Sequence, residues 1–105
     1  MPTKTGPFDA ARYFAAADQQ AELLSGALEN GDAGYIANAL GVIARARGMT
    51  DVAHGAGVTR EALYKSLSLD GDPKLSTLLG VIKSLGFKLT AEAIAPPTRL
   101  RRVAP

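Results

Sequence analysis

Two very short helices joined through a glycine are predicted within residues 48–68, and they constrain the fold more than any other part of the chain. Thr50 can cap a first helix over residues 51–55, and Thr59 can cap a second helix over residues 60–68. Isolated helices shorter than about 12–15 residues are marginal in water, because the first turn costs more free energy than later turns. Both segments must therefore pack against a larger helical core.

The small and apolar residues of this stretch have the spacing of a helix-turn-helix, predicted over residues 50–68. Such a motif needs a small residue in its first helix, a glycine in the turn, and apolar residues that fix the second helix to the core. Ala53 and Gly57 supply the first two, and Val58 and Leu63 supply the apolar contacts. Alanine and glycine four residues apart are common in helical proteins, so the surrounding helices matter as much as the spacing.

A second helix held in this way would expose a polar face that suits the major groove of DNA. Arg60 can pair with guanine, and Lys65 can reach a phosphate or a guanine. Tyr64 has two equally good interpretations, which are contact with the DNA backbone and packing against the last helix. The predicted DNA-binding residues are Thr50, Thr59, Arg60, Glu61, Tyr64 and Lys65.

Helical spacing of apolar residues predicts the rest of an all-α body. The expected elements are a short helical turn over residues 8–14, a helix over 19–29 capped by Asp18, a helix over 33–47 capped by Asp32, and a helix from Pro73 to Leu85 capped by Asp72. The strongest stripe consists of Leu75, Leu78, Leu79, Ile82 and Leu85. We expect this stripe to face the core first and a partner surface second.

The period of the sequence changes near the C-terminus, where residues 87–95 alternate between apolar and polar side chains. Alternation of this kind indicates a short β-strand. A lone strand has unpaired backbone groups and must find a partner. The sequence therefore predicts a homodimer with dimer contacts at Phe87, Leu89, Ala91 and Ala93.

Composition indicates one domain, because the chain has 105 residues of which 47% are hydrophobic. Residues 1–17 are expected to form an N-terminal arm with a short helical turn. Residues 18–95 are expected to form the helix-turn-helix domain with its C-terminal strand, and residues 96–105 a basic flexible tail.

Charge divides the chain into an acidic front and a basic back. Residues 1–44 hold two basic and five acidic residues, a net charge of −3, whereas residues 45–105 hold ten basic and five acidic residues, a net charge of +5. Such asymmetry suggests two different partners. Two solvated faces of opposite sign are the simpler alternative.

Several function classes are disfavoured by the residues that the chain lacks. It has no cysteine, and His54 is its one histidine, so no metal cluster, phosphate loop or catalytic triad can be assembled. We therefore expect no enzymatic activity, no metal and no cofactor. Neither a signal peptide nor an apolar run of membrane-spanning length is present, which makes the cytoplasm the expected location and excludes a membrane partner.

Four segments of the chain resemble a known family. The segments "ARARGMT" and "TREALYKSLS", together with "FDAARYF" and "ALENGDAGYIANAL", are similar to HigA-like antidote proteins of bacterial addiction modules, over roughly residues 7–92. These belong to the lambda-repressor/Cro-type (Xre) helix-turn-helix group. The resemblance implies a five-helix, lambda-repressor-like DNA-binding domain. It also implies an antitoxin that neutralises a RelE/ParE-type toxin and represses its operon by binding operator DNA.

The acidic front of the chain is the predicted surface for such a toxin. Buried aromatic residues dominate many interfaces, so the predicted toxin-binding residues are Phe8, Tyr13, Phe14, Glu22 and Glu29. The aromatic residues have an alternative role in closing the core of the domain. For the whole chain, the alternative function is a stand-alone helix-turn-helix transcriptional regulator without a toxin partner.

One residue departs from the family pattern. The family usually has glutamine after the threonine that begins the first short helix, where it can touch DNA, and this chain has Asp51. A carboxylate there suits the helix dipole but repels phosphate. We therefore expect Asp51 either to point away from DNA or to weaken binding.

Overall fold

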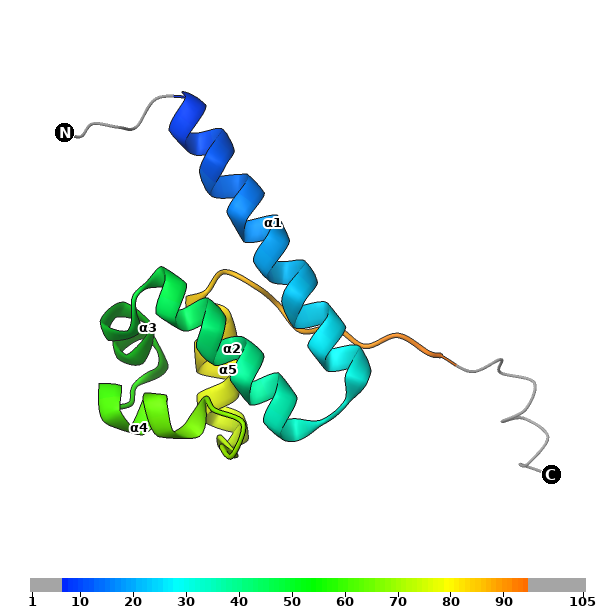
Figure 1. Cartoon of the computed structure of the whole chain (residues 1–105), viewed down its shortest axis with the longest axis vertical. Coiled ribbons are helices and arrows are strands. Elements are labelled where there is room, and N and C mark those ends of the chain that lie inside the picture. The colour runs from blue at the N-terminus through cyan, green and yellow to red at the C-terminus, as the bar shows by residue number, and fades with distance from the viewer. Residues whose placement is uncertain (1–6, 95–105) are drawn as a thin grey trace.

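The computed structural model describes residues 7–94, with side chains described from residue 16 onward, and its regular elements are all helices. In chain order they are α1 (Pro7–Asn30), α2 (Ala33–Arg47), α3 (Met49–Ala56), α4 (Arg60–Ser66) and α5 (Leu75–Ser84). Helices α2 to α5 form the body, and the N-terminal part of α1 projects beyond it (Figure 1). The all-α prediction is confirmed.

The first helix is a single element of 24 residues, Pro7–Asn30. The predicted helical turn over residues 8–14 and the predicted helix over 19–29 are parts of it, so the expected division after residue 17 falls inside a helix. The prediction of Asp18 as an N-cap is wrong for the same reason. Alanines and glutamines surround Asp18, and one aspartate among good helix formers costs well under about 1 kcal/mol.

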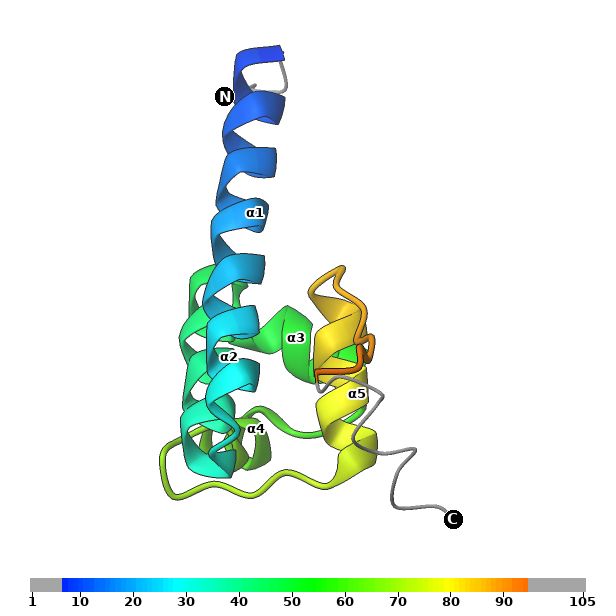
Figure 2. The same cartoon turned by 90° about the vertical axis from the view of Figure 1, so that its right-hand side faces the viewer.

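All five helices contribute to one apolar core. In Figure 2, α3 lies between α2 and α5, and the C-terminal part of α1 runs beside α2. The fully buried side chains therefore come from elements far apart in the sequence. The larger members of the core are Leu24, Leu40, Ile43, Met49, Val52, Leu63, Leu67, Val81, Ile82 and Leu85.

Two predictions about helix α5 are corrected. The helix begins at Leu75 after Lys74, which makes no side-chain capping bond, so Asp72 is not its N-cap. Residues 67–74 form the connection from α4 across the body to α5 (Figure 2), and Asp72 and Pro73 are used in that loop. The leucine stripe also faces the core only in part, because Leu75 is 67% exposed and Leu79 is 46% exposed.

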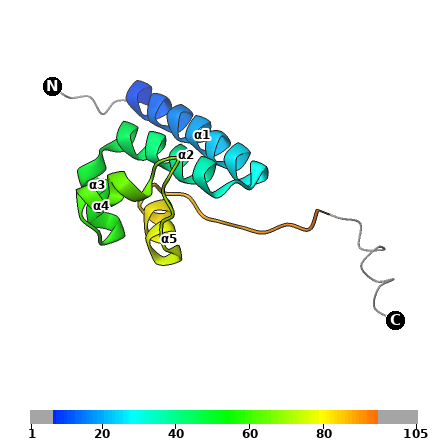
Figure 3. The same cartoon turned by 60° about the horizontal axis from the view of Figure 1, so that its bottom comes forward.

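The predicted C-terminal strand is not formed within the described residues 7–94. Residues 87–94 are neither helix nor strand, and they run away from the body as an extended segment (Figure 3). A strand is stabilised by hydrogen bonds to a neighbouring strand, and this part of the chain contains no second strand with which it could pair. The predicted pairing therefore depends on a partner.

Close packing in the body depends on glycine within α2, and Gly41 is the buried example. Gly41 is buried, and a Cβ atom built on it would collide with the backbone carbonyl of Leu67, just after α4. Glycine at this position lets the end of α4 approach the backbone of α2. A similar approach brings Gly80 of α5 against Ala56 of α3, where an added Cβ would lie 3.1 Å from the Ala56 Cα.

We predict that Gly41→Ala destabilises the protein by about 1–3 kcal/mol, because an overpacked contact against backbone cannot relax cheaply. Gly26→Ala is the matched control, since Gly26 lies in α1 with open space around its Cα. Alanine is the better helix former, so this control should stabilise by about 0.5–1 kcal/mol. Urea unfolding followed by circular dichroism measures both, and two changes of the same sign would contradict the proposed contact.

Candidate nucleic-acid interface

A left-handed glycine joins α3 to α4. Gly57 has φ 73° and ψ 29°, a conformation that residues with a Cβ rarely adopt. Its amide donates to the carbonyl of His54 over 3.2 Å, and the amide of Val58 donates to the carbonyl of Ala53 over 3.1 Å. The turn predicted at Gly57 is therefore confirmed, with Ala53 buried beside it.

The start of α4 is also as predicted. Thr59 is its N-cap, and the Thr59 Oγ1 accepts a hydrogen bond of 3.0 Å from the amide of Ala62. The helix ends at Ser66 instead of residue 68, since Leu67 already has non-helical angles. Helix α3 differs more, because it starts at Met49 after Gly48. Thr50 therefore lies inside α3, and its prediction as an N-cap is wrong.

Burial fixes which face of α4 points outward. Leu63 and Leu67 are 0% exposed, and half-buried Val58 packs against the same core. Apart from half-buried Ser66, the polar residues of α3 and α4 are exposed. Each of the six predicted DNA-binding residues is exposed: Thr50, Thr59, Arg60, Glu61, Tyr64 and Lys65.

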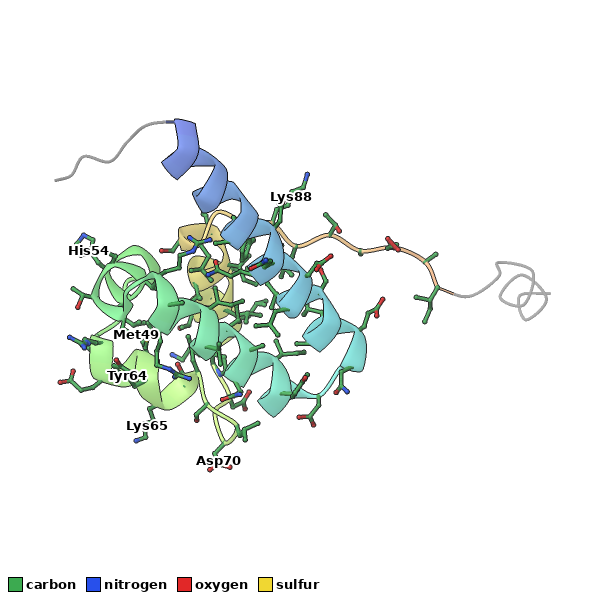
Figure 4. The ribbon with its side chains drawn as sticks, turned by 45° about the horizontal axis from the view of Figure 1, so that its top comes forward. Met49, His54, Tyr64, Lys65, Asp70 and Lys88 are labelled. Carbon is green, nitrogen blue, oxygen red and sulfur yellow. The ribbon has the colours of Figure 1, made fainter. Side chains whose placement is uncertain are left out.

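Arg60 connects the exposed surfaces of α3 and α4. Its Nη1 donates to the Thr50 Oγ1 over 3.4 Å, and its guanidinium carbon lies 5.6 Å from the centre of the Tyr64 ring. Tyr64 is 41% exposed, so it is not buried against α5, which was one of its two predicted roles. Figure 4 shows Tyr64 and Lys65 on α4, away from Lys88 near α1. The structure thus brings Thr50, Arg60 and Tyr64 together on one surface.

The charge of this surface is modestly positive. From Arg45 to Ser66 the chain holds four basic and two acidic residues, a net charge of +2 with His54 neutral. Asp51 is exposed in the first turn of α3. An exposed carboxylate next to Thr50 weakens the attraction of this surface for phosphate.

Arg47 has a role that the sequence does not indicate. Its Nε donates to the Oε1 of Gln20 in α1 over 2.7 Å, and its guanidinium carbon lies 5.7 Å from the centre of the Phe87 ring. Arg47 therefore links α2 to α1 and to the extended segment. Of the two arginines at the end of α2, only Arg45 is left exposed on the surface.

The acidic residues of α1 form a second surface. Asp18, Glu22 and Glu29 are exposed, and a rotation of about 100° per residue places them within about 40° of one another on the helix. Phe8, Tyr13 and Phe14 belong to the same helix by their backbone, and their side chains lie outside the described ones. We call Asp18, Glu22 and Glu29 the acidic face of α1.

A groove runs between α1 and the extended segment that follows α5. Its apolar floor contains Leu24, Leu28, Phe87 and Leu89, and it continues along Glu29, Lys88, Thr90, Glu92 and Ile94. Of the predicted dimer contacts, Phe87 is half-buried, Leu89 is 39% exposed, and Ala91 and Ala93 are exposed. Sequence patterns predict the alternation of this segment but give no sign of its contact with α1.

Other kinds of site are not evident in the described part of the chain. Among the described side chains of residues 16–94, no three acidic or histidine side chains gather closely enough to hold a metal ion. Within the same residues, no helix combines the length and the apolar character needed to span a bilayer.

Comparison with known proteins relates this chain to a described family and to a bacterial protein. A protein family described as "Probable addiction module antidote protein" matches residues 4–93. An uncharacterized protein of Haemophilus influenzae is 36% identical over 92 residues, which cover 88% of this chain and 95% of that relative. No solved structure matches the chain significantly. The family match covers all five helices and most of the extended segment.

The capping bond at α4 leads to a prediction about stability. Thr59→Ala removes the acceptor for the amide of Ala62 and should destabilise the protein by about 1 kcal/mol. Thr50→Ala is the matched control, because Thr50 lies inside α3 and caps no helix, and it should change stability by less than about 0.5 kcal/mol. Equal losses in thermal or urea unfolding would show that Thr59 has no capping role.

Proposed function

The chain belongs to the family of probable addiction module antidote proteins, and we propose that it is the antitoxin of a type II toxin–antitoxin pair that also represses its own operon. In this proposal it is a binding protein of the cytoplasm, without catalysis or cofactor. It has two partners, a RelE/ParE-type toxin and double-stranded operator DNA. The observation that supports DNA binding best is the orientation of α4, in which Leu63 is buried while Arg60, Tyr64 and Lys65 are exposed.

In the proposed complex, α3 and α4 act as a helix-turn-helix, and α4 enters the major groove. The contacts to Thr50 and Tyr64 hold the Arg60 guanidinium near the start of α4. A guanidinium can donate two parallel hydrogen bonds to O6 and N7 of guanine, which distinguishes this base from the others. Lys65 lies more than one turn further along and would contact phosphate, which fixes position without reading sequence.

A helix of seven residues reads few base pairs, so we propose that the protein binds its operator as a homodimer. Two copies of α4 would then contact half-sites about 34–36 Å apart on one face of the DNA. The operator is accordingly expected to be a palindrome, because its symmetry mirrors that of a two-fold dimer.

We propose that the toxin binds to α1 and not to α4. Toxins of the RelE/ParE type act near RNA and tend to be basic, and the acidic face of α1 would attract such a protein. In Figures 1 and 3, α1 and α4 lie on different sides of α2, so the two partners would not compete for one surface. The proposed apolar anchors are Phe8, Tyr13 and Phe14, all on α1.

The proposal predicts that Arg60→Ala weakens specific operator binding by about 1–3 kcal/mol. Lys65→Ala should weaken binding to all sequences alike and lower the slope of log K against log salt by about 1. Arg12→Ala removes one positive charge from α1 and should leave operator binding unchanged. Fluorescence anisotropy with operator and scrambled duplexes at several salt concentrations measures these effects. Unchanged operator affinity in Arg60→Ala would exclude α4 as the recognition helix.

Asp51→Gln provides a test with the opposite sign. Removing the exposed carboxylate from the first turn of α3 should tighten operator binding, because it removes repulsion from phosphate. Binding that stays the same or becomes weaker would mean that α3 does not approach the DNA backbone at this residue.

Toxin neutralisation is tested by co-expression with the basic protein encoded next to this gene. A variant with Arg60 and Lys65 both changed to Ala should restore growth as well as the natural chain does, since α4 is not the proposed toxin surface. A variant with Phe8, Tyr13 and Phe14 changed to Ala keeps the length of α1 and should bind the toxin at least tenfold more weakly. Growth rescue that requires Arg60 and Lys65, or full toxin binding by the triple alanine variant, would refute this separation of surfaces.

A further inference from the structure

Few backbone hydrogen bonds to other described residues hold the segment that follows α5. The amide of Phe87 donates to the carbonyl of Ile82 over 3.0 Å, and beyond it no backbone hydrogen bond joins residues 88–94 to any other described residue. The segment is extended, and it leaves the body while lining a groove with α1 (Figure 3). An extended backbone with free donors and acceptors is a template for pairing with a strand of another chain.

Apolar and polar side chains alternate along this segment. The odd positions Phe87 and Leu89 line the groove with Leu24 and Leu28 of α1. The even positions Lys88, Thr90 and Glu92 are polar and exposed, and they also line the groove. A partner strand must therefore match an apolar side and a charged side at once.

We propose that the partner strand is the same segment of a second copy, paired antiparallel with Thr90 opposite the partner subunit's Thr90. This inference deepens the proposed homodimer and rests on it. A two-fold axis through an antiparallel pair places one residue opposite its own copy. With Thr90 at that centre, Lys88 lies opposite the partner subunit's Glu92, and the symmetric pair repeats the contact. Opposite charges in directly facing positions stabilise a strand pair.

Neighbouring registers lose both charge pairs. A centre at Leu89 places Lys88 opposite threonine and Glu92 opposite glycine, and a centre at Ala91 places Lys88 opposite isoleucine. Shifts that put odd positions opposite even positions mix the apolar and polar sides. The centre at Thr90 is the register in which Lys88 and Glu92 face each other.

The two ends of the segment that can pair also place its centre at Thr90. Helix α5 ends at Ser84, and Pro96, which has no amide hydrogen to donate, follows the segment on the other side. Both are six residues from Thr90. Pairing centred there also places alanine, at positions 91 and 93, opposite the larger Leu89 and Phe87. Each large side chain that contacts its own α1 thus meets a small residue across the strand pair.

The self-complementary order of charges favours a second copy over the toxin as the partner strand. A lysine and a glutamate at equal distances on either side of one threonine form a palindrome of charge. Two identical antiparallel strands can place opposite charges face to face only when the charges have this order. Pairing with an unrelated strand sets no such condition.

Cysteine cross-linking tests the register in the full chain, which has no cysteine of its own. In the proposed pair, the Cβ atoms of two copies of residue 90 lie about 4.5–5.5 Å apart, whereas two copies of residue 93 are about 20 Å apart along the strands. Thr90→Cys should form a disulfide-linked dimer under mild oxidation, and Ala93→Cys, the matched control, should not. Cross-linking of Ala93→Cys alone, or of neither variant, would overturn the register.

Charge exchange tests the paired contact. Lys88→Glu and Glu92→Lys each place like charges opposite one another twice in the dimer, so each should raise the dimer dissociation constant in sedimentation equilibrium by about tenfold or more. The double variant restores opposite charges and should return the constant to within about threefold of the natural chain. Single variants that dimerise as tightly as the natural chain would overturn the proposal. If Arg60→Ala still weakens operator binding in that case, the proposed function remains supported although the proposed strand pair does not.

Discussion

Burial of Leu63 is the constraint on which the arrangement of this protein depends most. Helix α4 has only seven residues and gains its stability from packing. Leu63 and Leu67 are completely buried in a core shared with the other helices. Once Leu63 faces inward, the 3.6-residue period turns Glu61 and Lys65 away from the core, and Arg60 and Tyr64 are exposed beside the buried face. The position of the candidate nucleic-acid interface is thus a consequence of how the core is filled.

Local signals in the sequence predicted local features well and helix boundaries less well. Asp32 and Thr59 cap their helices as expected, and Gly57 makes the expected left-handed turn. Asp18 and Asp72 have equally good capping side chains and cap nothing in α1 or α5. A cap stabilises a helix by about 1 kcal/mol. A continuous run of helix-forming residues can outweigh this free energy, and so can the need for a loop long enough to reach the next helix. A capping side chain therefore does not by itself determine where a helix begins.

Contacts between distant elements lay beyond prediction from the sequence. Arg47 and Gln20 are 27 residues apart, and no periodicity relates them. The contact of Arg60 with Thr50 is similar, because it depends on the crossing of α3 and α4 rather than on either helix alone. For the candidate interface, the sequence therefore predicted which side chains are exposed but not how Arg60 is held. The extended segment shows the same limit, since its alternation was visible and its groove with α1 was not.

The proposed surfaces for the toxin and for the second copy meet in that groove. Glu29, on the acidic face of α1, lines it together with Lys88 and Glu92 of the extended segment. A basic toxin bound to α1 would change the electrostatic environment of both charge pairs in the proposed dimer. Two linked binding equilibria affect each other equally. A toxin that binds the dimer more tightly than the monomer therefore also strengthens dimerisation. In the proposed dimer, operator affinity depends on pairing two copies of α4, so the sign of this coupling would determine whether the toxin assists repression or relieves it.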